Sequence, residues 1–250
     1  MNPSLSTPHV ASLEDLFNWV EHTVQHAAQL VNEDMHTLKS RMLGKLAGFT
    51  MSTAFSGIGA PEHAMHGILA NLASGQPLPL RVKNLHAIEV NQESRRELVC
   101  LPAPPQCLFD DINSFWNKIY DVDETCSLEQ LTHIIRKGNA ITTRGGWCSL
   151  HQAYCELEAA TCNVGGTPCP DWSAAGSRAG ECGLDRISTL AWVAMRYQLE
   201  ENYFLNENVP VFQYELMLDV LADKYMQMSC VCKLEKSGRI GGVGGLLLDS

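Results

Sequence analysis

The stretch GFTMSTAFSGIGAPEHAMHGILANLA, residues 48–73, contains the change of pattern that decides the fold. Its first eight residues are β-prone, SGIGAPE is a glycine turn, and HAMHGILANLA has the apolar spacing of a helix. This order predicts a strand, a tight turn and a helix, the first unit of an α/β fold. The glycines would let a ligand approach the backbone ahead of the helix, and a plain tight turn explains them about as well.

The same alternation continues along the chain. We predict strands and helices in turn at LHAIEV (85–90), NQESRRELVC (91–100), QCLFDDI (106–112), RISTLAWVAMRYQLEE (186–201), NYFLNENV (202–209), YELMLDVLADKY (214–225) and MQMSCVCKL (226–234). Alternation of this kind favours an α/β protein with a mostly parallel, doubly wound sheet.

Polar residues follow one predicted strand after another. In doubly wound sheets, ligands bind at the carboxyl ends of the strands, so these positions are the functional signal. Glu89 has the placement of an acid that grips ribose hydroxyls. Asp111 fits a hydrogen bond from an adenine amino group, and it fits nearly as well the N-cap of a following helix. The set is Ser56 to Gly59, Glu89, Asp111, Cys169, and Glu207 with Asn208.

Cys169 lies in GGTPCPDWSAAG, residues 165–176, between Pro168 and Pro170. The prolines fix the backbone on both sides, and the glycines remove bulk around the thiol. The thiolate form of cysteine is a strong nucleophile, and it is populated when the pKa of the thiol is lowered. A strand-to-helix turn can lower this pKa. The alternative interpretation is a buried structural thiol, which suits several other cysteines: Cys100, Cys107, Cys162, Cys230 and Cys232.

Composition limits the classes of function. Apolar residues make up 45% and charged residues 18% of the 250 residues, which is typical of one globular α/β domain with a modest appendage. No apolar run is long enough to span a bilayer, and no secretory signal is seen. We therefore expect an intracellular protein, nuclear in a eukaryote, with reduced thiols and no membrane contact. The net charge of −10 argues against tight nonspecific binding of nucleic acid by this chain alone.

We divide the chain into three parts. Residues 1–47 are predicted as a helical extension, because apolar side chains at three-four spacing run from residue 12 to residue 43 as one long amphipathic helix. We predict residues 48–236 as the α/β domain that carries the candidate site, with an insertion at about 114–153, and residues 237–250 as a flexible glycine-rich tail.

The insertion contains a pattern that suggests metal binding. In CSLHQAYC, residues 148–155, Cys148, His151 and Cys155 have a spacing that could contribute to a zinc site. They supply only three ligands without an obvious fourth, whereas a structural zinc site needs four. We therefore expect a surface insertion and no metal.

Six segments in order carry a resemblance to a known family. They are FSGIGAPEHA (55–64), IEVNQESRREL (88–98), FDDIN (109–113), GGTPCPDWSAAG (165–176), RISTLAW (186–192) and NENV (206–209). This ordered set resembles the first six blocks of the cytosine carbon-5 DNA methyltransferases, and the similarity covers roughly residues 48–232. It implies a Rossmann-like methyltransferase fold that binds S-adenosylmethionine.

The resemblance implies a role for each candidate residue. The cofactor would lie over the Gly57–Gly59 turn, with its ribose held by Glu89 and its adenine held by Asp111 and Ile112. The full cofactor set comprises Phe55, Ser56, Gly57, Ile58, Gly59, Glu89, Val90, Asp111, Ile112 and Leu190.

The implied catalytic residues are Cys169, Glu207, Asn208 and Pro168. Cys169 would add to ring carbon 6 of a flipped-out cytosine while Glu207 donates a proton or hydrogen bond to ring nitrogen 3. Asn208 would order the turn that holds the cysteine, and Pro168 would shape it.

The sequence departs from the family after Cys232. KLEKSGRIGGVGGLLLDS, residues 233–250, stands where a Gln-x-Arg-x-Arg block and a target-recognition region are expected. Three hypotheses therefore stay open: methylation of cytosine in DNA, the same reaction on RNA, and a noncatalytic cofactor-binding or regulatory module whose substrate half comes from a partner chain. A further hypothesis is that the N-terminal helix supports the cofactor site in place of a C-terminal one.

Overall fold

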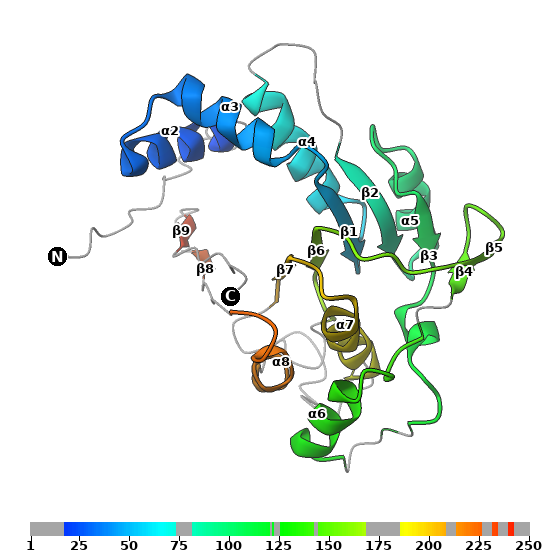
Figure 1. Ribbon diagram of the computed structural model, residues 1–250. Coiled ribbons are helices and arrows are strands. Elements are labelled where there is room, and N and C mark those ends of the chain that lie inside the picture. Colours follow the sequence, from blue (N-terminus) through cyan, green and yellow to red (C-terminus); the bar gives the residue numbers. More distant parts are fainter. Residues whose placement is uncertain are drawn as a thin grey trace. The chain divides into compact units, whose positions relative to one another are not determined.

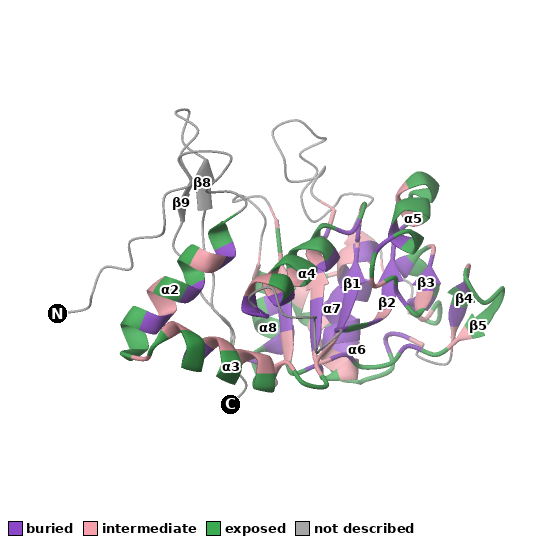
Figure 2. Ribbon diagram, turned by 90° about the horizontal axis from the view of Figure 1, so that it is seen from above, coloured by how far each residue is buried: buried purple, intermediate pink, exposed green. Residues whose placement is uncertain are grey.

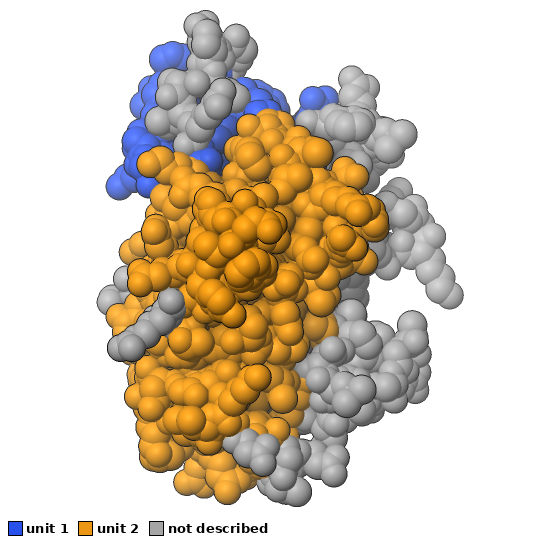
Figure 3. All heavy atoms as spheres, turned by 90° about the vertical axis from the view of Figure 1, so that its right-hand side faces the viewer, with its two compact units in different colours: residues 1–48, 63–82, 228–246 blue, residues 49–62, 83–227, 247–250 orange. Residues whose placement is uncertain are grey.

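The computed structural model describes residues 18–73, 82–120, 122, 126–142, 145–168, 186–208, 214–226, 232–234 and 240–242. The chain divides into two compact units (Figure 3). Unit 1 comprises residues 1–48, 63–82 and 228–246, and unit 2 comprises residues 49–62, 83–227 and 247–250. Within the described ranges, no helix has both the length and the apolar character needed to cross a membrane.

Unit 2 is built on a seven-stranded mixed sheet in the order β5-β4-β3-β2-β1-β6-β7 (Figure 1). The strands are β1 (Thr50–Ala54), β2 (Lys83–Ile88), β3 (Cys107–Phe109), β4 (Gly146–Cys148), β5 (Ala153–Cys155), β6 (Cys162–Gly165) and β7 (Tyr203–Asn206). Five of them, β3-β2-β1-β6-β7, pair in parallel, whereas β4 and β5 are antiparallel additions at one edge. The predicted α/β class is confirmed, and the sheet is compatible with a Rossmann-like fold.

Helices pack on both faces of this sheet. Because successive side chains of a strand point to opposite faces, each central strand contributes residues to both layers. On β2, Ile88 packs in the larger core with η1 (Ile112–Phe115), α7 (Arg186–Leu199) and α8 (Glu215–Leu221). Its neighbour Ala87 packs in a second core with Leu98 of α5 (Gln92–Val99). Figure 2 shows the buried central strands between these layers. The sheet is therefore covered on both faces, as a parallel sheet requires.

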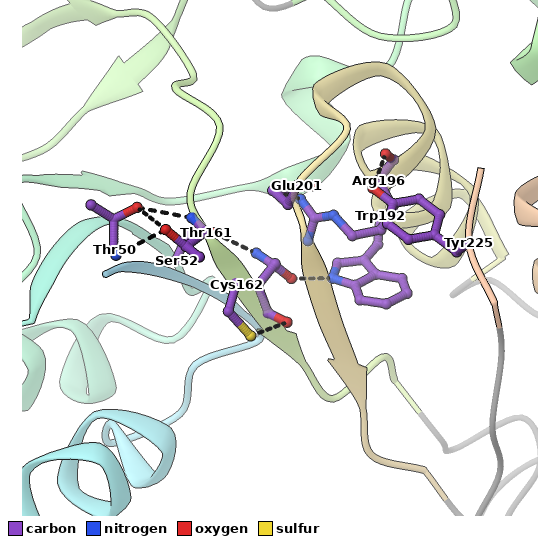
Figure 4. A network of polar contacts seen from close by, with 9 residues as sticks. Thr50, Ser52, Thr161, Cys162, Trp192, Arg196, Glu201 and Tyr225 are labelled. Atoms are coloured by element: carbon purple, nitrogen blue, oxygen red, sulfur yellow. Dashed lines mark hydrogen bonds and ion pairs between the residues drawn. The ribbon is translucent and has the colours of Figure 1, made fainter. Parts of the chain in front are cut away.

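A network of buried polar side chains fixes β6 in the sheet (Figure 4). The amide of Asn163 donates to Ser52 Oγ of β1 at 2.8 Å, and its oxygen accepts from Trp192 Nε1 of α7 at 3.0 Å. Arg196 and Glu201 lie nearby as a fully buried ion pair, with 2.9 Å between the charged atoms, although the pair lacks the alignment of a hydrogen bond. Burial raises the pKa of Glu201, and the charge of Arg196 opposes this rise.

The predicted insertion contributes to the sheet. It contains α6 (Leu128–Arg136), which begins with a capping box between Ser127 and Gln130 and packs against α7 and α8. It also contains β4 and the first residue of β5, and these two strands extend the sheet beyond β3. The insertion is thus a structured edge of unit 2.

In unit 1, the prediction of one long N-terminal helix is wrong for the described part. Two helices are present, α2 (Trp19–Val31) and α3 (Met35–Lys45). The break occurs because Asn32 adopts the left-handed conformation and Asp34 caps the second helix by accepting from the Thr37 N–H at 3.0 Å. The apolar spacing continues across the break, and both helices pack with the C-terminal part of α4 (Ala60–Leu72), which begins in unit 2 and ends in unit 1.

The C-terminal elements also differ from expectation. The predicted last strand is β8 (Cys232–Leu234), which pairs with β9 (Ile240–Gly242) as a separate antiparallel sheet instead of closing the large one. Residues 240–242 belong to the segment that was predicted as a flexible tail. The structure places the short strand β9 within that segment.

Candidate functional site

The last residues of the five parallel strands form one row across the sheet. Ile88 is the Cα partner of both Ala54 and Phe109, and Gly165 is the partner of both Ala54 and Asn206. The segments that follow these residues therefore leave the sheet at the same edge. The strand order reverses between β1 and β6, and this is the part of an open α/β sheet where ligands bind.

A tight turn follows β1. Phe55 has a φ of +58°, a left-handed conformation that is uncommon outside glycine, and Gly57 has a φ of +53°. The N–H groups of Phe55 and Ser56 both donate to the Ile88 carbonyl, at 2.8 and 3.3 Å. Sheet hydrogen bonding thus holds a backbone conformation that costs about 1 kcal/mol, a kind of strain that clusters at functional sites.

The two glycines of the turn serve different purposes. A Cβ at Gly57 would meet no atom within 4 Å, so this position is open as well as left-handed. A Cβ at Gly59, where φ is +88°, would lie 2.8 Å from Leu101 Cδ1, so this glycine allows close packing. Ile58 between them is 63% exposed. The turn therefore presents open backbone and an apolar side chain to solvent.

The Glu89 carboxylate is anchored beside this turn. One oxygen accepts from the Gly57 N–H and the other from the Asn91 N–H, each at 2.7 Å. Arg95 donates to the carbonyls of Glu89 and Val90 and so fixes the backbone there. A carboxylate has about four acceptor positions. Glu89 therefore retains capacity for hydroxyl donors of a ligand, next to Val90, which is 74% exposed.

Asp111 acts as the N-cap of η1, because its carboxylate accepts from the Asn113 N–H at 2.9 Å. The N-cap role that the sequence offered as the alternative for Asp111 is thus observed. One hydrogen bond leaves other acceptor positions on the same carboxylate. Asn113 in turn accepts from Ser188 of α7 at 3.0 Å. Ile112 and Leu190 are buried in the larger core, so these two shape the wall of the site from beneath rather than forming its surface.

The end of β7 orders the segment that leads to Cys169. The Asn208 amide donates to the Thr167 carbonyl at 2.9 Å and to its hydroxyl at 2.7 Å. Thr167 immediately precedes Pro168, which is half-buried. Cys169 itself lies outside the described residues. The partner that Asn208 holds is therefore two residues before the candidate nucleophile.

Glu207 lies next to the same segment. Its N–H donates to the Gly165 carbonyl at 2.9 Å, and a Cβ on Gly166 would lie 3.5 Å from its carboxylate. Burial, and secondarily the negative charge of Glu207, raises the pKa of Tyr214. An acidic group is thus held against the backbone that precedes Cys169.

Comparison of the chain with models of protein families and with curated proteins gave no match. The candidate site therefore rests on its own geometry. Glu89, Asp111, Glu207 and the glycine turn come together at one sheet edge, as the sequence predicted, whereas Leu190 lies deeper.

Sequence reasoning missed the polar residues beneath the turn. Thr53 donates to Glu62 at 2.7 Å and lies 2.7 Å from the Ser56 hydroxyl, and Asn84 donates to the same Glu62 oxygen at 3.1 Å. These side chains are buried and tie β1, its turn, α4 and β2 together. The one sequence signal for them was the presence of hydroxyl residues in the β-prone run that contains β1.

Proposed function

We propose that this chain transfers a methyl group from S-adenosylmethionine to carbon 5 of cytosine in DNA, with Cys169 as the nucleophile. The observation that carries the proposal is the single row of strand ends. Phe55, Glu89, Asp111, Gly166 and Glu207 each follow that row within two residues. A cofactor-binding group and a nucleophile-bearing segment at one edge of the sheet are what the reaction needs.

The residues at the β1 and β2 ends fit the cofactor. Glu89 offers free acceptor positions for ribose hydroxyls, and the open position at Gly57 lets a ligand approach the backbone. Ile58 and Val90 are exposed apolar side chains that suit the faces of an adenine ring. When bound, S-adenosylmethionine supplies an electrophilic methyl group.

The residues at the β6 and β7 ends fit the covalent step. Cys169, as the thiolate, would form a bond to ring carbon 6 of cytosine, while Glu207 would donate a proton or hydrogen bond to ring nitrogen 3, which takes up the displaced electron pair. Carbon 5 would thereby become nucleophilic and take the methyl group, whose bond to the sulfonium sulfur of the cofactor would break. Loss of the carbon 5 proton to a base, breakage of the bond between the cysteine sulfur and carbon 6, and return of any proton on ring nitrogen 3 to Glu207 would restore the ring, Cys169 and Glu207.

Asn208 has a positioning role in this scheme. Its two hydrogen bonds to Thr167 fix the backbone before Pro168, so that the segment carrying Cys169 leaves β6 in one direction. A nucleophile that is oriented before substrate binds loses less entropy on the way to the transition state.

The charge of the chain supports a second candidate. A net charge of −10 gives little attraction to phosphates, which supply much of the affinity of nucleic-acid-binding proteins. A noncatalytic module that binds S-adenosylmethionine and relies on a partner for nucleic acid is the alternative. The experiment below also distinguishes RNA from DNA as the substrate.

The test measures cofactor binding and methyl transfer separately. Calorimetry measures the affinity for S-adenosylmethionine, and a labelled methyl group is followed into DNA or RNA with wild type, Cys169→Ala and Cys100→Ser. Cys100 is an exposed free thiol, so its variant is a matched control. We expect transfer by wild type and the control, and none by Cys169→Ala.

Each outcome has a meaning. Label in RNA alone would change the substrate, and cofactor binding without transfer to either polymer would favour the noncatalytic module. A folded chain that does not bind S-adenosylmethionine would overturn the proposal.

A further inference from the structure

Four metal-ligating side chains converge at the edge of the sheet that carries β4 and β5. The Cys3His cluster consists of Cys107, Cys148, His151 and Cys155, whose ligand atoms all lie within 4.8 Å of one another. Cys107 is the first residue of β3, Cys148 ends β4, Cys155 ends β5, and His151 is in the turn between β4 and β5. The fourth ligand that the local spacing lacked thus comes from a different strand.

The distances in this cluster match those around a tetrahedral zinc ion. With Zn–S bonds of about 2.3 Å and Zn–N bonds of about 2.0 Å, a tetrahedron separates sulfur from nitrogen by about 3.5 Å. His151 Nδ1 lies 3.2 Å from Cys155 Sγ, 3.5 Å from Cys148 Sγ and 3.7 Å from Cys107 Sγ. One imidazole nitrogen therefore faces three sulfur atoms at the required spacing.

The backbone around the cluster favours a thiolate. The Leu108 N–H donates to Cys148 Sγ at 3.4 Å. Amide donors to a ligating sulfur are the outer contacts that orient metal ligands.

Three thiolates as close together as these sulfur atoms would repel one another without a cation, because all the ligand atoms lie within 4.8 Å of one another. All three cysteines are free thiols, although they lie close together. A divalent cation removes this conflict, because it binds the deprotonated forms and releases their protons.

We propose that the Cys3His cluster binds a structural zinc ion. Four protein ligands complete the tetrahedron and leave no open position for water or substrate, so the ion has a structural role rather than a catalytic one. Three cysteine thiolates and one neutral imidazole with Nδ1 as the ligand atom make up the set, and three thiol protons are released on binding.

The position of the ion explains how such short strands persist. β4 and β5 have three residues each, and β4 pairs with β3 through the single partner pair Phe109 and Cys148. A zinc ion would fasten the β4–β5 turn to the first residue of β3. It would also fix β3, the strand that leads to Asp111. The zinc-binding proposal itself does not depend on the proposed methyl transfer.

The experiment measures metal content and metal coordination on the full chain. Untagged protein is purified under reducing conditions, dialysed, and analysed for zinc by mass spectrometry. Cobalt is then substituted for zinc, because its visible and near-ultraviolet bands report tetrahedral geometry and thiolate ligands. The variants are Cys107→Ser and Cys155→Ser, and Cys100→Ser is the matched control.

We expect about one zinc ion per chain in wild type and in Cys100→Ser, with tetrahedral cobalt bands of a three-thiolate site. Zinc affinity should fall at least tenfold in Cys107→Ser and Cys155→Ser. Cys107→Ser is the most informative variant, because Cys107 lies outside the CSLHQAYC segment and is a ligand only if the four-residue cluster binds the ion. If these variants fail to fold, the wild-type cobalt spectrum still tests the ligand set.

Three results would overturn the proposal. They are a folded wild type that takes up neither zinc nor cobalt, an unchanged affinity and spectrum in Cys107→Ser, and a disulfide between two cluster cysteines in reduced preparations.

Discussion

The Glu89 side chain is held by two backbone hydrogen bonds. Each of its carboxylate oxygens already accepts one backbone N–H, so the side chain cannot swing away without leaving two donors unpaired. The carboxylate is therefore preorganised for a ligand that brings hydroxyl donors, and its charge strengthens those hydrogen bonds.

This position predicts the effect of Glu89→Gln on cofactor affinity. The amide keeps the shape of the side chain but loses its charge and one acceptor, so a charged hydrogen bond worth about 1.5 to 3 kcal/mol is lost. We expect the Kd for S-adenosylmethionine, measured by calorimetry, to rise roughly tenfold or more. Glu93→Gln is the matched control, because Glu93 is exposed and pairs only with Arg96 in the described residues. Equal affinities in both variants would contradict a ribose-binding role.

His86 predicts a pH dependence of stability. It is buried on β2 against Phe109, and burial, with a smaller contribution from the Arg196 charge, lowers its pKa from 6.5 to about 3. Between these two values the unfolded chain binds a proton that the folded chain does not, so stability falls as pH falls through this window. From pH 7 to pH 5 the loss due to this group is about 2 kcal/mol.

His86→Leu should remove that contribution. Urea unfolding of wild type and variant at both pH values measures the difference, and contributions of other groups cancel in the comparison. The same loss of stability in both proteins would show that His86 is not the group responsible.

Sequence reasoning reached the single residues that follow strands and missed their partners. Glu89, Asp111 and Glu207 could be predicted because a polar residue after a buried strand has a defined place in an α/β sheet. Thr167 as the partner of Asn208, and Cys107 as the partner of the CSLHQAYC segment, could not, because such pairs come from strand order and register.

At the scale of elements, β6 and α7 pack so closely that one position admits only glycine. A Cβ on Gly165 would lie 2.4 Å from Trp192 Nε1. Trp192 is fully buried, donates to Asn163, and has an edge contact with Phe204 of β7. The ring therefore cannot move aside without loss of contacts on β6 and β7.

Gly165→Ala should destabilise unit 2. Overpacking typically costs 1–3 kcal/mol, and loss of the Trp192 hydrogen bond adds about 1 kcal/mol. We expect urea unfolding to show a loss of about 2 to 4 kcal/mol. Gly166→Ala is the matched control in the same unit, because its Cβ would lie at an ordinary 3.5 Å from Glu207. Similar stabilities for the two variants would contradict this account of the packing between β6 and α7.

The elements that the sequence predicted well are those with a strong local pattern. β1, β2, α5, α7 and β7 follow the expected alternation. In α7 the apolar residues are numerous enough for their periodicity to show, whereas the signal for α5 is a run of helix-forming residues after its Asn91 cap. β4 and β5 were missed because three residues cannot establish a period of two. The break between α2 and α3 was missed because apolar spacing outweighed the Asn32 and Asp34 signals.

At the scale of the whole molecule, every candidate residue for cofactor and catalysis belongs to unit 2. Residues 55–59, 89–90, 111–112, 168–169, 190 and 207–208 all fall within 49–62 and 83–227. Unit 1 holds α2, α3 and their shared core with α4. A ligand that binds only the folded form of one unit stabilises that unit.

This division predicts where S-adenosylmethionine changes hydrogen exchange. At a concentration 100 times its Kd, the cofactor stabilises the unit that binds it by about 2.7 kcal/mol, which slows exchange through unfolding of that unit about 100-fold. Mass spectrometry should show this slowing in peptides from 49–62 and 83–208, with little change in peptides from 18–48, and Glu89→Gln at the same cofactor concentration should reduce it. Strong protection of residues 18–48 would contradict a site confined to unit 2, because the N-terminal helices would then take part in binding, as the sequence hypothesis for that region supposes.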